Sequence, residues 1–208
     1  MRKTIFIILS CILLNQGFLI AQENISEFRN AKIGLTYSSF GENDVFRFNE
    51  LDGAASYNSD YFRTFGISYV HPLNKWLEVE SGIEYSRHHI LIQPNLPPNI
   101  CAFPRKASFS LINIPVTLRA GFLKYFFVNG GLFLDVDASI NSPIANQTGI
   151  GVLLGLGVKY DFDFGISVFV NPYSNLHSLL PFQTEKHHQR ILENGFRIGF
   201  SYDLRKLK

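Results

Sequence analysis

Histidine and carboxylate side chains that would suit a divalent metal gather in two parts of the chain. They are His88, His89, Glu185, His187 and His188. Neutral imidazole and carboxylate ligands suit Zn or Cu, provided that folded loops bring the two groups together. The spacing within each group is not a metal-ligand signature, and solvated loop histidines explain the pattern better. The sequence therefore predicts no metal ligands, no cofactor-binding residues and no cofactor.

A nucleophile, a base and an orienting carboxylate form a second chemical possibility. Ser86, Glu84 and either His88 or His89 supply these residue types. Residues two apart on a strand lie on one face about 7 Å apart, which is too far for a nucleophile–base hydrogen bond. We therefore predict a structural polar lining at these positions and no catalytic residues.

The composition excludes several classes of protein. The chain has 208 residues, which suits a single domain with a full core. Its 19 Lys+Arg and 17 Asp+Glu leave no basic footprint for a nucleic acid. Aromatic residues make up 14% and charged residues only 17%, which is not the composition of a disordered chain.

The N-terminus has the layout of a secretory signal. Positive charges at residues 2–3 precede an apolar stretch over 4–20 and the small residue Ala21. A membrane anchor is the alternative, but polar residues interrupt the apolar stretch. We predict a signal peptide over 1–22 and one mature domain over 23–208.

Beyond residue 30 the dominant pattern is an apolar–polar alternation with period two, which predicts an all-β domain. The expected strands cover 31–40, 60–71, 76–88, 108–120, 124–136, 148–160, 164–173 and 195–204. Pro115 lacks an N–H, so we expect a bulge or local irregularity in its strand.

The connections between these strands alternate in length. The long ones are 41–59, 89–107, 137–147 and 174–194, and the short ones are 72–75, 121–123 and 161–163. Long loops on one rim and tight turns on the other are typical of outer-membrane barrels, whose short turns face the periplasm. The sequence therefore predicts an eight-stranded antiparallel up-and-down transmembrane β-barrel.

Glycine positions indicate which face of the strands points inward. A soluble barrel turns its apolar face inward, whereas a membrane barrel turns it toward lipid. By parity the polar face carries Gly34, Gly66, Gly82, Gly131, Gly149, Gly151, Gly155, Gly157, Gly165 and Gly199. An eight-stranded barrel has a narrow interior, so small residues belong there and the apolar face points outward.

The same parity predicts a plugged lumen with charges of both signs. These residues are Glu78, Glu80, Glu84, Arg119, Asp135, Lys159, Arg197 and Asp203, and unpaired they would be costly to bury. Tyrosines on the apolar face form two expected girdles. Tyr69, Tyr160 and Tyr202 lie near the short turns, and Tyr37, Tyr61 and Tyr85 near the long loops.

Three segments resemble a known family. Residues 111–119 (LINIPVTLR) and 125–131 (YFFVNGG) resemble the hallmark of the outer-membrane β-barrel domain family that includes PorT-like proteins, with Asn113 and Arg119 in place of the usual Glu and Lys. Residues 149–160 resemble the family's glycine-rich strand. The resemblance implies a small barrel in a bacterial outer membrane, and PorT-like members are linked to protein secretion.

The last predicted strand also resembles the C-terminal signal read by the barrel-assembly machinery. The matching residues are Arg197, Gly199, Tyr202 and Leu204, although the chain continues to Lys208 instead of ending in an aromatic residue. The resemblance implies that this machinery is a partner during insertion.

Together these features predict an integral outer-membrane protein that is not an enzyme and has a structural or interaction role. We expect it to contact outer-membrane lipid and to bind a protein partner through its long extracellular loops, with the proline-rich segment 93–104 as the best recognition surface. The alternative interpretation of this segment is an ordinary semi-rigid loop without a partner. Two alternatives stay open, a secreted soluble barrel that carries an apolar ligand and a lipid-modifying outer-membrane barrel enzyme.

Overall fold

The computed structural model describes residues 30–46, 56–94, 103–139, 142–183 and 188–207. Within these ranges the chain forms eight strands and one short 3-10 helix. They are β1 (Lys32–Phe46), β2 (Ser56–Pro72), β3 (Leu77–Gln93), β4 (Arg105–Phe122), β5 (Phe126–Asp137), β6 (Gly149–Asp161), β7 (Ile166–Pro181), β8 (Arg190–Asp203) and η1 (Leu204–Leu207). No helix within these ranges is long and apolar enough to cross a bilayer. The predicted signal peptide lies outside the described residues.

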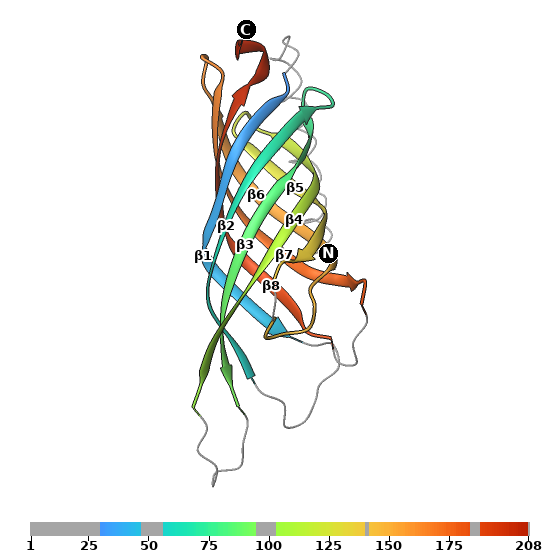
Figure 1. The fold of residues 1–208 in the computed structure, drawn as a ribbon. Coiled ribbons are helices and arrows are strands. Elements are labelled where there is room, and N and C mark those ends of the chain that lie inside the picture. The colour runs from blue at the N-terminus through green and yellow to red at the C-terminus, as the bar shows by residue number, and fades with distance from the viewer. Residues whose placement is uncertain (1–29, 47–55, 95–102, 140–141, 184–187, 208) are drawn as a thin grey trace, which may run out of the picture.

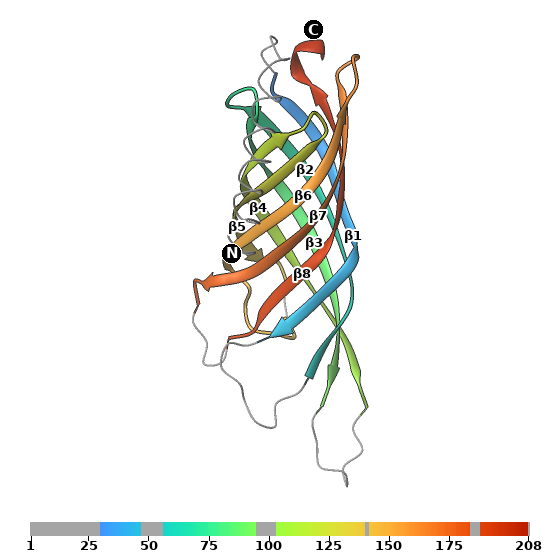
Figure 2. The ribbon, with the colours of Figure 1, turned by 180° about the vertical axis from the view of Figure 1, so that it is seen from behind.

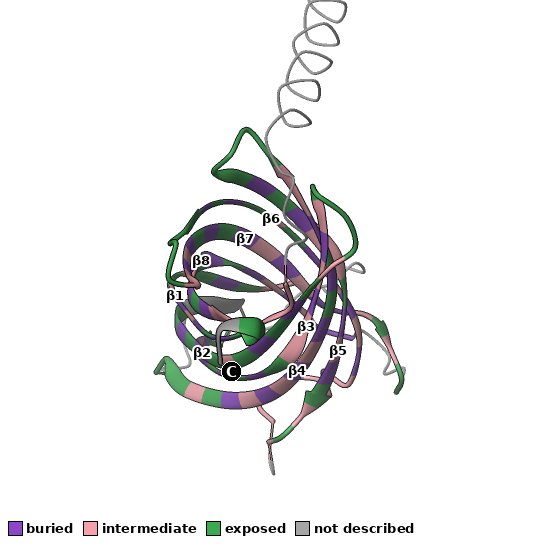
Figure 3. Ribbon diagram, turned by 90° about the horizontal axis from the view of Figure 1, so that it is seen from above, coloured by how far each residue is buried: buried purple, intermediate pink, exposed green. Residues whose placement is uncertain are grey.

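The strands form one closed antiparallel ring in sequence order (Figures 1 and 2). β1 closes the ring against β8, from Lys32 opposite Asp203 to Phe46 opposite Arg190. Figure 3 shows the ring from above. Closure matters in a bilayer because backbone N–H and C=O groups find no water there and must pair with one another. The predicted eight-stranded antiparallel barrel is confirmed.

The two rims differ as the sequence predicts. Short turns at residues 73–76, 123–125 and 162–165 lie at one end, which is at the top of Figure 1, and the strand ends that the longer connections join lie at the other. Gly165 was expected on the lumen face of a strand, but it lies in the last of these turns with φ of 98°. That left-handed backbone conformation favours glycine, and so explains the residue at this position.

Large apolar side chains cover the outside of the barrel between the two rims. Exposed examples are Leu35, Phe65, Ile67, Ile83, Val116, Leu118, Leu132, Leu154, Leu156, Val158, Val170, Phe196 and Phe200. Tyr69 and Tyr160 are exposed toward the short turns, and Tyr61 and Tyr85 toward the long loops. A soluble protein rarely exposes so large an apolar surface, whereas lipid requires one. The apolar face therefore points outward, which contradicts a soluble carrier with an apolar lumen.

Charged side chains of both signs fill the part of the lumen that this apolar belt surrounds. The buried ion pairs there are Lys159–Glu78 at 2.9 Å, Arg119–Glu80 at 2.5 Å, Arg197–Glu80 at 3.2 Å and Arg197–Glu84 at 3.5 Å. Asp203 is only partly buried, near the short-turn rim, where it accepts a hydrogen bond from Asn30. The ion pairs occupy the centre of the barrel, as the sequence predicts.

Phenylalanine rings explain three of the lumen-facing glycines. Phe127, Phe133 and Phe169 lie directly across from Gly157, Gly151 and Gly199 on the neighbouring strands, and each ring occupies the place of the missing Cβ atom. Arg119 lies over two of these rings, with its Cζ 4.5 Å from the centroid of Phe127 and 4.7 Å from that of Phe169. The glycines thus make room for aromatic rings that in turn pack on the buried ion pairs.

The polarity pattern reverses toward the long-loop rim. There the lumen is apolar and holds Ile90, Ile92, Phe109, Leu111 and Ile191, closed by Ile144 from the β5–β6 connection. The outward side chains at the same end include the exposed residues Glu42, Asp44, Arg63, Arg87 and Lys106. This section therefore has the polarity of a soluble barrel, and it extends past the lipid-facing belt. We call the buried apolar group the outer plug.

Pro115 lies at a gap in the pairing of β3 with β4, and the register is the same on both sides of the gap. The β3–β4 pairing runs from Leu77 opposite Ala120 to Ser81 opposite Val116, and it resumes in the same register at Glu84 opposite Asn113. The predicted irregularity at Pro115 is thus a gap in the pairing and not a bulge.

Candidate functional site

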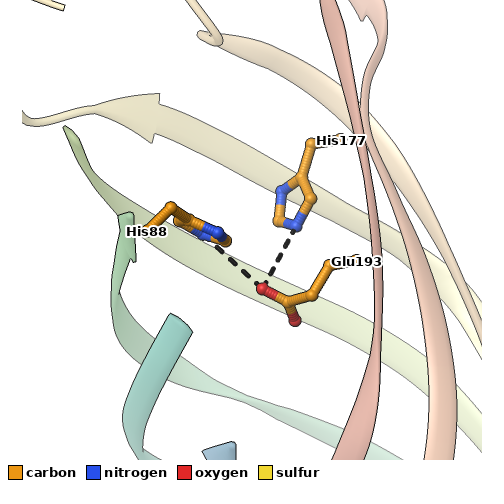
Figure 4. A group of neighbouring side chains, drawn as sticks. All are labelled: His88, His177 and Glu193. Atoms are coloured by element: carbon orange, nitrogen blue, oxygen red, sulfur yellow. Dashed lines mark ion pairs between the residues drawn. The ribbon is translucent and has the colours of Figure 1, made fainter. Parts of the chain in front are cut away.

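Three buried side chains from separate strands converge in the lumen (Figure 4). His88 comes from β3, His177 from β7 and Glu193 from β8. One potential ligand atom from each lies within 4.8 Å of the other two, and at most 1% of each residue is exposed. We call this group the lumen triad.

A bulge in β7 begins at His177, which already occupies an inward position of the strand. Ile150 pairs with Leu180, but Val152 pairs with Leu176, so β7 carries two extra residues at this point. Ser178 within the bulge has φ of 49°, and both it and His177 are buried. Bulges re-aim side chains, and here two consecutive residues of one strand are directed into the protein.

Asp135 orients the His177 imidazole. Its carboxylate oxygens lie 3.1 and 3.2 Å from His177 Nδ1, and the Ser178 backbone N–H also donates to this carboxylate at 3.3 Å. A proton on Nδ1 therefore donates to Asp135. The opposite nitrogen, Nε2, then faces Glu193 Oε2 at 3.8 Å.

The other carboxylate oxygen of Glu193, Oε1, accepts two hydrogen bonds. The Tyr173 hydroxyl donates to Oε1 at 2.6 Å, and the Asn175 side-chain N–H donates to the same atom at 3.4 Å. Oε2 and His177 Nε2 have no hydrogen-bond partner among the described residues. The triad thus contains two fully buried polar atoms that face each other without a hydrogen bond.

His88 completes the triad from the opposite side. Its Nε2 lies 3.5 Å from Glu193 Oε2 and 3.2 Å from Ser86 Oγ, and its Nδ1 lies 3.5 Å from the Asn43 amide nitrogen. The imidazole stacks on Phe109 with a centroid distance of 4.9 Å. Aromatic packing therefore fixes the plane of this ring.

The expectation that Ser86 and His88 lie too far apart to interact is wrong. The Cα separation of alternate strand residues does not limit the contact, because the long imidazole side chain leans back along β3 to reach the Ser86 hydroxyl at 3.2 Å. The nucleophile–base–carboxylate set that includes Glu84 is nevertheless not assembled, since this carboxylate pairs with Arg197 and accepts a hydrogen bond from Thr36. Ser86 and His88 are both fully buried.

The loop histidines considered from sequence are not brought together among the described residues. His89 faces outward and stacks on Tyr61 with a centroid distance of 4.2 Å. His188 is buried, and its Nε2 lies 3.0 Å from Ser178 Oγ. Glu185 and His187 lie outside the described residues.

Sequence reasoning missed His177 and Glu193 because both fall in the predicted loop 174–194. A signal for each was present in the alternation. On β7 the inward positions continue as Asn171, Tyr173, Asn175 and His177, and on β8 the inward positions Ile191 and Glu193 precede Gly195 and Arg197. Extending the parity of each strand into its long connection would have placed both residues in the lumen.

The closed ring with its apolar belt is the architecture of an integral outer-membrane β-barrel protein. Solved structures share the fold. The chain is similar to the outer-membrane protein AlkL (11% identity, 87% of this chain and 94% of that chain, TM-score 0.50). Weaker likenesses are OprG from Pseudomonas aeruginosa (13%, 84% and 95%, 0.47) and the translocator domain of the autotransporter NalP from Neisseria meningitidis (12%, 98% and 98%, 0.32). No family model and no curated protein matches the chain.

Proposed function

We propose that the protein is a non-enzymatic, non-conducting barrel that acts in the outer membrane by binding a protein partner outside the cell. The observation that carries the proposal is the length of β3 and β4. Their pairing continues to Ile92 opposite Arg105, so the ladder runs alongside the outer plug as far as its residue Ile92. Figures 1 and 2 show the resulting hairpin projecting from the rest of the barrel.

A filled lumen supports an interaction role over a transport role. The ion-pair layer and the outer plug lie in series along the barrel axis, and both consist of buried side chains. Burial also weighs against the lipid-modifying alternative, because the Ser86 hydroxyl and His88 imidazole present no surface to a substrate.

The projecting hairpin has the surface that a partner would need. Phe103, next to the start of β4, is 86% exposed, and Arg105 and Lys106 beside it are also exposed. An exposed aromatic residue flanked by basic residues suits a partner with an apolar contact surrounded by acidic groups. The resemblance to PorT-like proteins favours protein secretion as the process.

A complementation experiment tests this function. A deletion strain would receive either the full chain or a variant in which residues 94–104 are replaced by a Gly/Ser linker, and secreted proteins would be quantified. Loss of secretion in the deletion strain, restored by the full chain but not by the variant, supports the proposal. Unchanged secretion on deletion contradicts the secretion role. Restoration by the linker variant, at equal outer-membrane levels, contradicts the hairpin as the binding surface.

A further inference from the structure

We propose that the lumen triad is a binding site for one divalent transition-metal ion, with Zn²⁺ as the ion that fits best. Two imidazole nitrogens and one carboxylate oxygen form a donor set found in zinc sites with three protein ligands. The ligand atoms are Nε2 of His88, Nε2 of His177 and Oε2 of Glu193. This inference does not depend on the proposed secretion role.

His177 Nε2 and Glu193 Oε2 do not satisfy each other. With its proton on Nδ1 toward Asp135, His177 presents a lone pair at Nε2 to the lone pairs of Glu193 Oε2. Two acceptors facing each other in a fully buried space repel, and leaving them unsatisfied is costly. A cation between them turns both contacts into attractions.

The three ligand atoms lie close enough together for one ion to be drawn between them. Zn–N and Zn–O bonds of about 2.0–2.1 Å in a tetrahedral site place neighbouring ligand atoms about 3.3 Å apart. The separations from Glu193 Oε2 are 3.5 Å to His88 Nε2 and 3.8 Å to His177 Nε2. All three ligand atoms lie within 4.8 Å of one another, so binding would require the two imidazole rings to move toward each other by side-chain rotation. The Ser86 hydroxyl, 3.2 Å from His88 Nε2, stands beside the remaining coordination position.

The residues around His177 and Glu193 hold these two side chains as neighbours hold metal ligands. Metal-binding histidines usually donate their other ring N–H to a carboxylate, which fixes the tautomer and raises basicity. Asp135 supplies that carboxylate to His177. Tyr173 and Asn175 bond to Glu193 Oε1 and leave Oε2 for the ion.

The local charge also favours a bound cation. Asp135 and Glu193 are both fully buried, and aromatic rings line the site, with Phe133 5.0 Å from the His177 ring and Phe109 4.9 Å from the His88 ring. Two carboxylates in such surroundings need compensating positive charge. One divalent ion supplies it in full, whereas a proton on one imidazole supplies half.

The ion would join three strands across the lumen, since the ligands come from β3, β7 and β8. No ladder connects β3 directly with β7 or β8. The metal would therefore act as a structural cross-link directly beneath the outer plug, formed while the barrel folds.

The experiment uses the untagged full-length mature protein, refolded into detergent with and without Zn²⁺ and dialysed against metal-free buffer. We expect one zinc per folded chain by elemental analysis and a rise in the thermal midpoint of the gel-mobility shift. Refolding with Co²⁺ in place of zinc is expected to give the visible absorption of a low-symmetry cobalt site. A folded protein that retains no zinc and gives no cobalt absorption overturns the proposal.

Variants locate the ion. Glu193→Gln and His177→Gln should abolish zinc retention, and Asp135→Asn should weaken zinc binding about 10- to 100-fold because it acts through His177. The matched control is His89→Gln, which changes a histidine adjacent to His88 on the outer face. Zinc retained by folded Glu193→Gln protein, or lost from His89→Gln, places the ion elsewhere and contradicts the site. If the triad variants do not fold, the cobalt spectrum of the unaltered protein tests the proposal. Cobalt bound by nitrogen and oxygen atoms without a thiolate absorbs with a characteristic intensity and at a characteristic wavelength.

Discussion

Phe127 on β5 lies directly across from Gly157 on β6, and its ring occupies the space that a Cβ atom at residue 157 would need. Adding a methyl group there forces this ring off its rotamer and against Arg119, whose Cζ lies 4.5 Å from the ring centroid. Overpacking of this kind costs about 1–3 kcal/mol. We therefore expect Gly157→Ala to lower the free energy of unfolding in detergent by that amount, measured by urea titration of the heat-modifiable band. Gly130→Ala is the control, because its added carbon would meet the flexible end of Leu154 at 3.0 Å and the Leu153 carbonyl oxygen at 3.5 Å, an ordinary contact distance.

The ion pair between Arg119 and Glu80 predicts a large effect of removing one charge. Both side chains are almost fully buried. Glu80→Gln would leave Arg119 without its carboxylate, and breaking a buried pair from one side costs about 3–5 kcal/mol. The exposed pair Lys106–Asp60, at 3.2 Å, is the comparison, since Lys106→Ala should cost less than about 1 kcal/mol. Equal effects at the two sites would show that the lumen is hydrated instead of tightly packed.

The lipid-facing belt predicts that an arginine substitution destabilises the barrel by different amounts at two equally exposed positions. Leu156 on β6 is 53% exposed and Leu73 in the 73–76 turn is 54% exposed. Arginine facing hydrocarbon at mid-bilayer costs about 2–4 kcal/mol and near the interface about 0–1 kcal/mol. We expect Leu156→Arg to destabilise the barrel in lipid vesicles far more than Leu73→Arg, as measured by urea-dependent folding. Similar costs would contradict the assignment of the belt to lipid.

The outer plug predicts protection of the residues below it from reagents in water. In a Cys101→Ser background, a cysteine introduced by Ser86→Cys should react very slowly with a water-soluble maleimide, because this position is fully buried. Adding Ile144→Ala removes about 2–5 kcal/mol of packing, so local opening and labelling should become more than about tenfold faster. Ser108→Cys on the exposed face of β4 should label rapidly in both backgrounds. Fast labelling at residue 86 without the Ile144 change would show that the lumen is open.

The lipid-spanning part of the fold follows directly from alternation. Along β6, Leu154, Leu156 and Val158 point outward while Leu153 and Lys159 are buried, as the sequence pattern predicts. A single physical rule, apolar toward lipid and small or charged toward a narrow lumen, governs this whole section. The strand number, the direction of the faces and the charged lumen were therefore all predictable.

The long-loop half was harder to predict because its lumen is apolar, so the inward and outward faces of a strand no longer differ clearly in polarity. In β3 the outward Leu91 lies between the inward Ile90 and Ile92, so alternation in polarity disappears where the lumen becomes apolar. The lumen triad lies at this transition. The β7 bulge also turns Ser178 inward next to His177, and such an insertion depends on the register with β6, which a single strand does not reveal. Residues from distant strands that meet only through ring closure leave no spacing signature in the chain.

The seam between β1 and β8 has a consequence for how the protein is made. The residues that seal the ring, such as Lys32 opposite Asp203, are separated by almost the whole described chain. A nascent chain that has not yet reached β8 carries two open edges, and these edges would have to be shielded from lipid and from other chains. We therefore expect insertion to wait for the last strand and the unfinished sheet to need shielding until then. Premature termination before residue 190 would then be expected to yield no shortened barrel, only material for proteolysis.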